Sequence, residues 1–129
     1  MEQYVTPLSA REYPADSPFL SQTALEVTDG RHLVRDSDDL IVVSFNYRLN
    51  IFGQPNAPQL VSSTDSQNFG LLDQKAAVDW VKANIASFGG DPERITLWGQ
   101  SAGGTSADIY AQSYPQDTGV KGLILQSGR

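Results

Sequence analysis

The stretch Arg94-Ile95-Thr96-Leu97-Trp98-Gly99-Gln100-Ser101-Ala102-Gly103-Gly104 combines a short apolar run, a Gly-x-Ser-x-Gly motif and small residues that can open a helix. A strand, a sharp turn and a helix in this order form a nucleophile elbow, which raises a serine hydroxyl at the end of a sheet. The motif alone would also fit a Gly-rich loop with a solvated serine. The apolar run before it and the helix-compatible residues after it favour the elbow.

Two glycines and one amide complete the predicted elbow. A Cβ at Gly99 or Gly103 would crowd a serine that occupies a sparsely allowed backbone conformation. Ser101 would stand at the start of a helix, where unpaired N–H groups favour negative charge. We therefore name Ser101 as the candidate nucleophile, the Ala102 N–H as the candidate oxyanion donor, and Gly99 and Gly103 as the elbow glycines.

The flanking sequence predicts alternating strands and helices. Residues 40–47 and 122–126 are apolar and β-branched, as in strands covered on both faces, and residues 94–98 form the strand before the elbow. Helices are expected at about 69–88, after the candidate N-cap Asn68, and at 102–112. Strand, helix, strand, helix, strand makes two βαβ units, so the predicted fold class is α/β with a mostly parallel sheet.

The front of the chain lacks such a pattern. Pro7, Pro14 and Pro18 interrupt residues 1–33, which we expect to be an irregular N-terminal segment of coil and short extended pieces. Residues 34–129 are expected to form the folded domain, with an irregular segment at 48–68. Three strands would leave two open sheet edges, so the domain resembles part of a larger fold.

Composition excludes several classes of protein. The 129 residues carry a net charge of −6 without a basic cluster, which argues against a nucleic-acid partner. The chain has no cysteine, so no disulfide or thiolate metal site is possible, and we expect no cofactor and no metal. No apolar run reaches the length of a membrane span, and the first residues do not resemble a secretory signal. The compartment stays unassigned.

The sequence resembles the type-B carboxylesterases, the cholinesterase-like branch of the α/β-hydrolases. From about residue 30 to the C-terminus, several motifs occur in the order and spacing of that family. They are Ile41-Val42-Val43-Ser44-Phe45-Asn46-Tyr47-Arg48-Leu49-Asn50-Ile51-Phe52-Gly53, Asn68-Phe69-Gly70-Leu71-Leu72-Asp73-Gln74, residues 80–92, Ile95–Gly104 and Leu125-Gln126-Ser127-Gly128. The resemblance implies a partial α/β-hydrolase domain that acts on small-molecule carboxylic esters through a serine nucleophile, Ser101, with Ala102 as an oxyanion donor.

Some positions depart from the family pattern. Gln100 stands where the family commonly has Glu, and Gln54 stands where an apolar residue is usual. Arg48 matches an arginine of a structural ion pair whose acidic partner lies upstream in the family, in a segment without a match here. Since a buried arginine without a partner would be costly, we expect Arg48 to be solvated.

The resemblance also implies parts that these 129 residues do not supply. The family has a His-Gly-Gly-Gly oxyanion loop before the first of these strands, but no Gly-Gly pair occurs here before residue 89. The catalytic acid and histidine of the family follow the serine in the order Ser, Glu or Asp, His. None of the 28 residues after Ser101 is a histidine, and His32 is the only imidazole.

Other residues could stand in for the missing ones, but ordinary roles fit them better. We expect His32 to be a surface histidine and Asp108 and Asp117 to be solvated. Asp73 and Asp91 match structural positions of the family. The aromatic side chains of Trp80, Phe88 and Trp98 are expected in the core rather than in a pocket.

The leading hypothesis is therefore a carboxylic-ester hydrolase lineage with an acyl-enzyme mechanism, incomplete in these residues and so inactive in isolation. The alternative is a fragment or interaction module that keeps the hydrolase fold without catalysis, as in cholinesterase-like adhesion domains. A truncated gene model is a third reading of the same residues.

Overall fold

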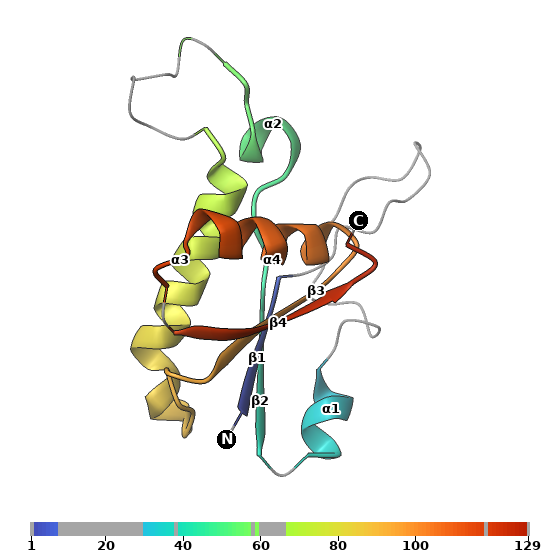
Figure 1. Ribbon diagram of the computed structural model, residues 1–129, viewed down its shortest axis with the longest axis vertical. Helices are drawn as coiled ribbons and strands as arrows, with labels where there is room; N and C mark the ends of the chain where they lie inside the picture. The colour runs from blue at the N-terminus through green and yellow to red at the C-terminus, as the bar shows by residue number, and fades with distance from the viewer. Residues whose placement is uncertain are drawn as a thin grey trace.

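A four-stranded parallel sheet organises the protein (Figure 1). The computed structural model describes residues 2–7, 30–37, 39–57, 59, 67–117 and 119–128. Its strands are β1 (Glu2–Pro7), β2 (Leu40–Phe45), β3 (Ile95–Gln100) and β4 (Val120–Gln126), in the spatial order β2-β1-β3-β4. All three neighbouring pairs run parallel. The α/β fold class expected from the sequence is confirmed, with strand positions within a few residues of the expected ones.

Most of the segment 1–33, expected to be coil with short extended pieces, lies outside the described residues, but residues 2–7 form a full strand of the sheet. These residues form β1, which lies between β2 and β3 and pairs with both. A single six-residue strand has no flanking periodicity that separates it from coil, so its place is decided by pairing between distant strands. The expectation also missed α1 (Arg31–Arg35), a helix of five residues without a side-chain cap.

Helix α3 (Phe69–Asn84) begins where the sequence predicts and ends one turn before the predicted end at about residue 88. Asn68 caps it, because its side-chain oxygen accepts the Leu71 N–H at 3.0 Å. The last predicted turn is a 3₁₀ helix, η3 (Ile85–Phe88), which ends at Gly89 with a φ of 82°. Glycine adopts this left-handed conformation without strain, so the chain can turn toward β3.

The core lies between one face of the sheet and the two long helices, α3 and α4 (Ala102–Ser113). Apolar side chains at helical spacing on α3 and α4 meet alternate residues of β3. The fully buried side chains are Val78, Val81, Ile85, Ile95, Leu97, Ala107 and Tyr110. Ile41, Val43 and Phe45 of β2 pack against this cluster, so β2 uses the same face.

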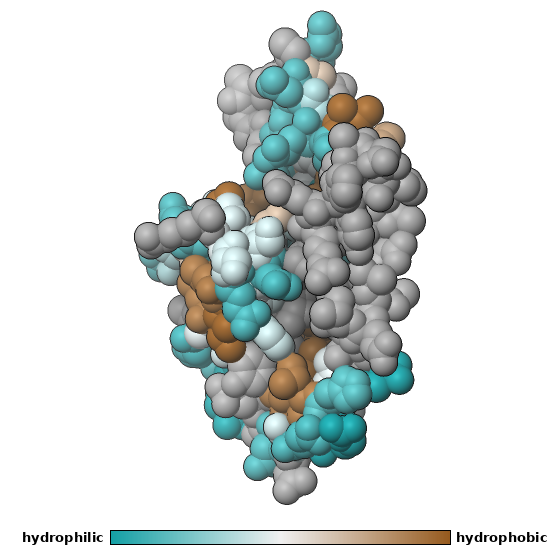
Figure 2. Space-filling view, turned by 90° about the vertical axis from the view of Figure 1, so that its right-hand side faces the viewer, coloured by the Kyte–Doolittle hydropathy of each residue, from teal (hydrophilic) through white to brown (hydrophobic). Residues whose placement is uncertain are grey.

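The other face of the sheet is approached by the start of α1. A Cβ on Gly30 would lie 2.5 Å from the Cγ1 of Val42, whose side chain points away from the core between Ile41 and Val43. On the outer edge of the sheet, Leu123 and Leu125 of β4 are 40% and 44% exposed. Figure 2 shows apolar surface as separate patches among hydrophilic residues, on the side of the molecule that carries α1.

A short helix, α2 (Asn50–Gly53), lies in the segment 48–68 that the sequence analysis expected to be irregular. Gly53 must be a glycine, because a Cβ there would overlap the carbonyl group of Arg48. Ile51 and Phe52 are 70% and 72% exposed on this helix. Among the described helices, none is both long and apolar enough to cross a membrane.

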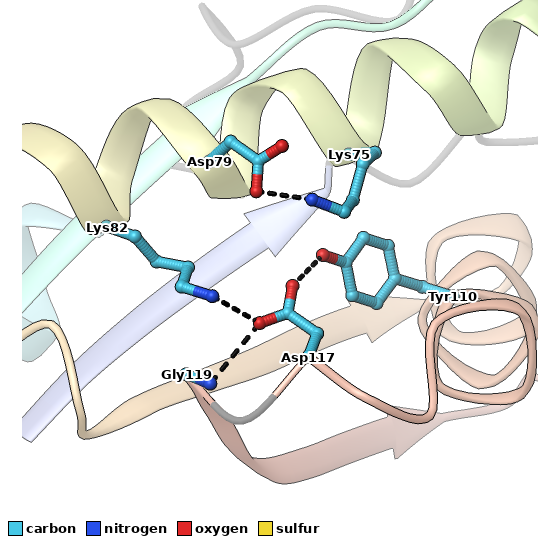
Figure 3. Close-up of polar contacts among 6 residues, drawn as sticks. All are labelled: Lys75, Asp79, Lys82, Tyr110, Asp117 and Gly119. Atoms are coloured by element: carbon cyan, nitrogen blue, oxygen red, sulfur yellow. Dashed lines mark hydrogen bonds and ion pairs between the residues drawn. The ribbon is translucent and has the colours of Figure 1, made fainter.

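A polar cluster ties α3 to the loop between α4 and β4 (Figure 3). The Asp117 carboxylate accepts hydrogen bonds from Lys82 Nζ at 2.5 Å and from the Tyr110 hydroxyl at 2.6 Å. It also accepts the Gly119 N–H at 3.2 Å, and its side chain is only 4% exposed. The expectation that Asp117 is solvated is therefore wrong, because two distant donors compensate the burial of its charge.

Candidate active site

Ser101 occupies the turn between β3 and α4, at the carboxyl end of the sheet. Its φ is 52° and its ψ is −121°, a conformation that a residue with a Cβ rarely adopts. Such strain costs about 1–3 kcal/mol and persists only where the surrounding structure enforces it. The prediction that residue 101 lies in a sharp turn between strand and helix is confirmed.

The elbow closes because β3 and α4 touch through their backbones. A Cβ on Gly99 would overlap the carbonyl carbon and oxygen of Gly103 and lie 2.6 Å from the amide nitrogen of Gly104. Gly103 is itself buried at this contact. A Cβ on Gly104 would lie 3.0 Å from the Gly99 carbonyl oxygen, so Gly104 belongs to the same contact. Gly99 and Gly103 are the glycines that the motif predicts, and Gly104 is a third glycine of this contact that the motif does not predict.

Two backbone N–H groups at the elbow, those of Ser101 and Ala102, differ in whether they already have an acceptor. The Ser101 N–H donates to the Gln126 carbonyl of β4 at 2.7 Å, so it is not free for a ligand. Ala102 is the first residue of α4 and is exposed, and an amide in the first turn of a helix has no acceptor within the helix. The Ala102 N–H is thus suited to bind an oxyanion, as the sequence predicts.

A pocket of about 180 Å³ opens beside Ala102. It lies between one face of α4, the segment after β2 and the first turns of α3. The Tyr47 hydroxyl in its wall is buried and makes no well-formed hydrogen bond within the described part of the chain. Burial raises the pKa of Tyr47, and the neighbouring Ser106 hydroxyl opposes that shift. The lining residues are Tyr47, Arg48, Leu49, Asn50, Gly53, Gln54, Asn68, Gly70, Leu71, Gln74, Ala102, Ser106 and Ile109.

His32 does not lie at this site. It is an exposed residue of α1, which precedes the amino end of β2, whereas Ser101 follows the carboxyl end of β3. Since all strands run parallel, the two residues belong to opposite ends of the sheet (Figure 1). The expectation of a surface histidine is confirmed, and the only imidazole in the sequence is not a partner of Ser101.

The candidate carboxylates also have other roles. Asp108 is exposed on α4, as expected. Asp91 accepts the Glu93 N–H at 2.9 Å and binds Arg94 Nε at 2.9 Å, which fixes the turn before β3. The hydrogen bond from Glu93 is the main cause that lowers the pKa of Asp91, although the small burial of its carboxylate opposes it.

Arg48 is 52% exposed, as expected for a solvated side chain, but it does have an acidic partner. Asp73, in the first turns of α3, accepts hydrogen bonds from Arg48 Nε at 2.8 Å, from its Nη2 at 2.7 Å and from its backbone N–H at 3.0 Å. The guanidinium also lies 5.1 Å from the centre of the Phe69 ring. Its hydrogen bond to Asp73 lowers the pKa of that carboxyl, so Asp73 has the structural role that the sequence analysis gave it.

The expectation of core positions is wrong for two of the three long aromatic side chains. Trp80 is 53% exposed and Phe88 is 65% exposed, and their ring centres lie 6.4 Å apart on the outer side of α3 and η3. Trp98 of β3 is half-buried. The helical spacing of Phe88 with Val81 and Ile85 suggested burial, but the change to 3₁₀ geometry at Ile85 rotates Phe88 away from the core.

No three acidic or histidine side chains of the described residues gather into a group that could hold a metal ion. At the end of the sheet, Ser101 contributes a hydroxyl and Ala102 a backbone amide. A strand–turn–helix elbow that carries a serine at the carboxyl edge of a parallel sheet defines a chain with the α/β-hydrolase arrangement.

Comparison with known proteins gives the same class. The profile of the Carboxylesterase family matches residues 17–129. The chain is 56% identical over 88 residues to Secreted lipase 5 of Gibberella zeae, covering 68% of this chain and 16% of the relative. It is 55% identical over 95 residues to the Chlorogenic acid esterase of Aspergillus niger (74% and 18%). With Cholinesterase 1 of Branchiostoma lanceolatum it shares 43% over 97 residues (74% and 26%).

The chain belongs to the carboxylesterase family, and the resemblance noted from its motifs is confirmed. The matched residues cover 16% and 18% of the two fungal relatives, so the chain spans a minor part of their length. The family match begins at residue 17, earlier than the motifs alone indicated.

The strain at Ser101 leads to a stability prediction. We expect Ser101→Gly to raise the free energy of unfolding by about 1 kcal/mol, because glycine relieves the positive φ at a smaller cost in chain entropy. Ser101→Ala keeps the Cβ and should stay close to the wild type. Urea titration followed by circular dichroism measures both. A glycine variant less stable than the alanine variant would contradict the strained assignment.

Proposed function

We propose that Ser101 is the nucleophile of a carboxylic-ester hydrolase and that the Ala102 N–H stabilises the oxyanion. The observation that supports this most directly is the backbone of Ser101, held at a φ of 52° between β3 and α4. A strained serine is retained where it presents its hydroxyl beyond the sheet. The esterase and lipase names of the relatives agree with this reaction class.

The proposed reaction has two stages. In the first, the Ser101 Oγ bonds to the ester carbonyl carbon, the Ala102 N–H binds the carbonyl oxygen as it becomes negative, and the alcohol leaves with a proton as the acyl-enzyme forms. In the second, water attacks the acyl-enzyme carbonyl, the carboxylic acid is released with the water oxygen, and a proton from that water restores the Ser101 hydroxyl.

The proton acceptor is the part that residues 1–129 do not supply in this proposal. The serine hydroxyl must lose its proton as it attacks, and a base such as imidazole normally takes it. His32 lies at the other end of the sheet, and the carboxylates Asp73, Asp91 and Asp117 are engaged in ion pairs. We propose that an acid and a histidine from further chain complete the site, and that the 129 residues alone react slowly.

The substrate is proposed only as a class, a small-molecule carboxylic ester. The names of the relatives specify a lipase, a chlorogenic acid esterase and a cholinesterase, which differ in both acid and alcohol. What they share is the ester bond, and the elbow is the element that acts on that bond.

The competing proposal is a module that keeps the hydrolase fold for binding alone. The lack of an imidazole beside Ser101 favours it, since a serine without a base is a poor nucleophile. It predicts that Ser101 reacts no faster than any surface serine. The ester-hydrolase proposal predicts a serine that is selectively reactive once a base is supplied.

Free imidazole can supply that base in an experiment. The purified chain is incubated with an alkyl fluorophosphonate, with and without imidazole, and the adduct is located by peptide mass spectrometry. We expect a Ser101 adduct whose rate of formation rises about tenfold or more with imidazole, because an external base replaces part of a triad worth several powers of ten. The reaction is followed by the Ser101 adduct rather than by release of the leaving group, because imidazole can itself react with activated acyl and phosphoryl compounds.

Two control variants make this result interpretable. Ser101→Ala should form no adduct, while Ser113→Ala, at the exposed far end of α4, should react like the wild type. Equal labelling of several surface serines would overturn the nucleophile assignment and favour the binding module. A stoichiometric burst from p-nitrophenyl acetate at neutral pH without imidazole would instead overturn the claim that the base is missing.

A further inference from the structure

The turn that follows β4 is bound to the first turn of α4, directly behind the elbow. The Gln126 carbonyl accepts the Ser101 N–H at 2.7 Å. Two residues later, the Gly128 carbonyl accepts the Thr105 hydroxyl at 2.8 Å. The turn 126–128 therefore makes one contact with the backbone of the candidate nucleophile and one with a side chain of the helix that follows it.

The packing between this turn and the helix leaves no room for side chains. A Cβ on Gly128 would lie 2.9 Å from the Gly104 carbonyl carbon and 2.9 Å from the Thr105 nitrogen. A Cβ on Gly104 would lie 3.2 Å from the Gly128 Cα and 3.3 Å from the Gln126 oxygen. A Cβ this close to backbone atoms would force the turn and the helix apart, because backbone atoms cannot yield by a rotamer change.

The turn is also strained. Ser127 has a φ of 51°, a left-handed value that costs a non-glycine residue about 1 kcal/mol or more. Ser101 has a φ of 52° on the other side of the same contact. The strained Ser101 thus donates its N–H to the carbonyl of Gln126, the residue just before the strained Ser127, so each strained residue relies on its surroundings to stay in place.

Thr105 connects Ser101 with the turn 126–128. Its backbone N–H donates to the Ser101 carbonyl at 3.0 Å, and its hydroxyl donates to the Gly128 carbonyl. Thr105 is exposed, so its hydroxyl could be satisfied by water. The hydroxyl therefore does not need Gly128 as a partner to avoid an unsatisfied buried group. What the hydrogen bond does is hold the turn 126–128 in position.

We propose that Thr105 is a positioning residue for Ser101: its hydroxyl holds the turn 126–128 against α4, which keeps the Gln126 carbonyl on the Ser101 amide. The backbone of Ser101 is then fixed from both sides, through its N–H by β4 and through its carbonyl by α4. With the Ser101 N–H occupied, the amide that faces a substrate is that of Ala102. The catalytic part of this inference rests on the proposed function of Ser101.

The test compares Thr105→Val, which keeps the shape and removes the donor, with Thr105→Ser, which keeps the donor at similar helix propensity. Ser113→Ala is the control for loss of an exposed hydroxyl from the same helix. Amide hydrogen exchange of Ser101 is measured by NMR against that of Leu97 in the core of β3. The rate of fluorophosphonate labelling at Ser101, with imidazole present, is measured in parallel.

We expect Thr105→Val to accelerate exchange at Ser101 about tenfold while Leu97 and the thermal midpoint stay close to the wild type, because only a local contact opens. Labelling at Ser101 should fall severalfold, and Thr105→Ser should restore both readouts. A merely structural role would change Leu97 and Ser101 together and would leave the labelling per folded molecule unchanged.

The outcomes separate this inference from the proposed function. Unchanged exchange at Ser101 in Thr105→Val would overturn the positioning role, whatever the labelling shows. Faster exchange with unchanged labelling would also overturn it, since the contact would then not matter for reactivity. If the wild type forms no Ser101 adduct, the proposed function fails, and the exchange data alone decide whether Thr105 holds the elbow.

Discussion

Gly99→Ala is expected to unfold the elbow and to lower the free energy of unfolding by about 3 kcal/mol or more. The added Cβ would overlap the Gly103 carbonyl group and lie 2.6 Å from the Gly104 nitrogen, all of them backbone atoms. Backbone atoms cannot move aside by changing a rotamer, so β3 and α4 must separate. Urea unfolding measures the loss, and labelling at Ser101 should disappear because the strained turn is no longer enforced.

Gly89→Ala is the matched control for this prediction. Gly89 has a φ of 82°, but a Cβ there would meet no atom within 4 Å. The same substitution then costs only the conformational strain of a left-handed alanine, about 1 kcal/mol. If the two variants lost equal stability, the close approach at Gly99 would not be the reason for glycine in the motif.

Much of this fold could be predicted because local signals agreed with the tertiary structure. Asn68 caps α3, Gly89 ends its last turn, and the run from Ile95 continues as a buried strand. Each element carries its own start or stop signal, and their alternation fixes the α/β class. The elbow was predictable for the same reason, since the Gly-x-Ser-x-Gly spacing reflects a steric requirement within a few residues.

The features that were missed depend on contacts between distant residues. β1 is a strand because β2 and β3 lie on both sides of it, and nothing within residues 2–7 states that. Asp117 is buried because Lys82, 35 positions earlier, reaches it from α3. Arg48 likewise finds Asp73 across 25 positions. Charged residues have no periodic signal, so their partners emerge only once the elements are packed.

The same limit applies to the site. Ser101, Ala102 and Gly99 were named from local sequence, whereas the support behind the elbow was not. In the sequence, Thr105 has no feature that distinguishes it from other helix residues. Its hydrogen bond to Gly128 spans 23 positions, so no local pattern predicts it. The motif Leu125-Gln126-Ser127-Gly128 was identified from the sequence only as part of the family resemblance. Its glycine was the one sequence feature that indicated a close approach of two backbones.

Asp117→Asn is expected to lower the free energy of unfolding by about 3 kcal/mol at neutral pH. The substitution keeps the shape of the side chain, but its NH₂ group cannot accept the hydrogen bonds that a carboxylate oxygen accepts from Lys82 Nζ or the Tyr110 hydroxyl. Because Asp117 is only 4% exposed, water cannot replace the lost acceptor. Asp108→Asn, on the exposed surface of α4, is the control and should change stability little.

The dependence on pH gives an independent check of the same cluster. Burial alone would raise the pKa of Asp117, but the hydrogen bonds from Lys82, Tyr110 and Gly119 outweigh it and hold the pKa below its ordinary value. In the unfolded chain the group titrates near its ordinary pKa of about 3.9. The stabilisation is therefore fully present above that pH and is lost as the pH falls through the lower, folded pKa.

The stability difference between the wild type and Asp117→Asn should thus be constant from neutral pH to about pH 5 and should narrow below about pH 4. Asp73 and Asp91, whose pKa values are also lowered, remain in both proteins and cancel in the difference. Urea titrations of both proteins at several pH values measure this difference in the free energy of unfolding. A difference that grows on acidification would mean that the pKa of Asp117 is raised rather than lowered, and that Lys82 and Tyr110 do not hold its charge.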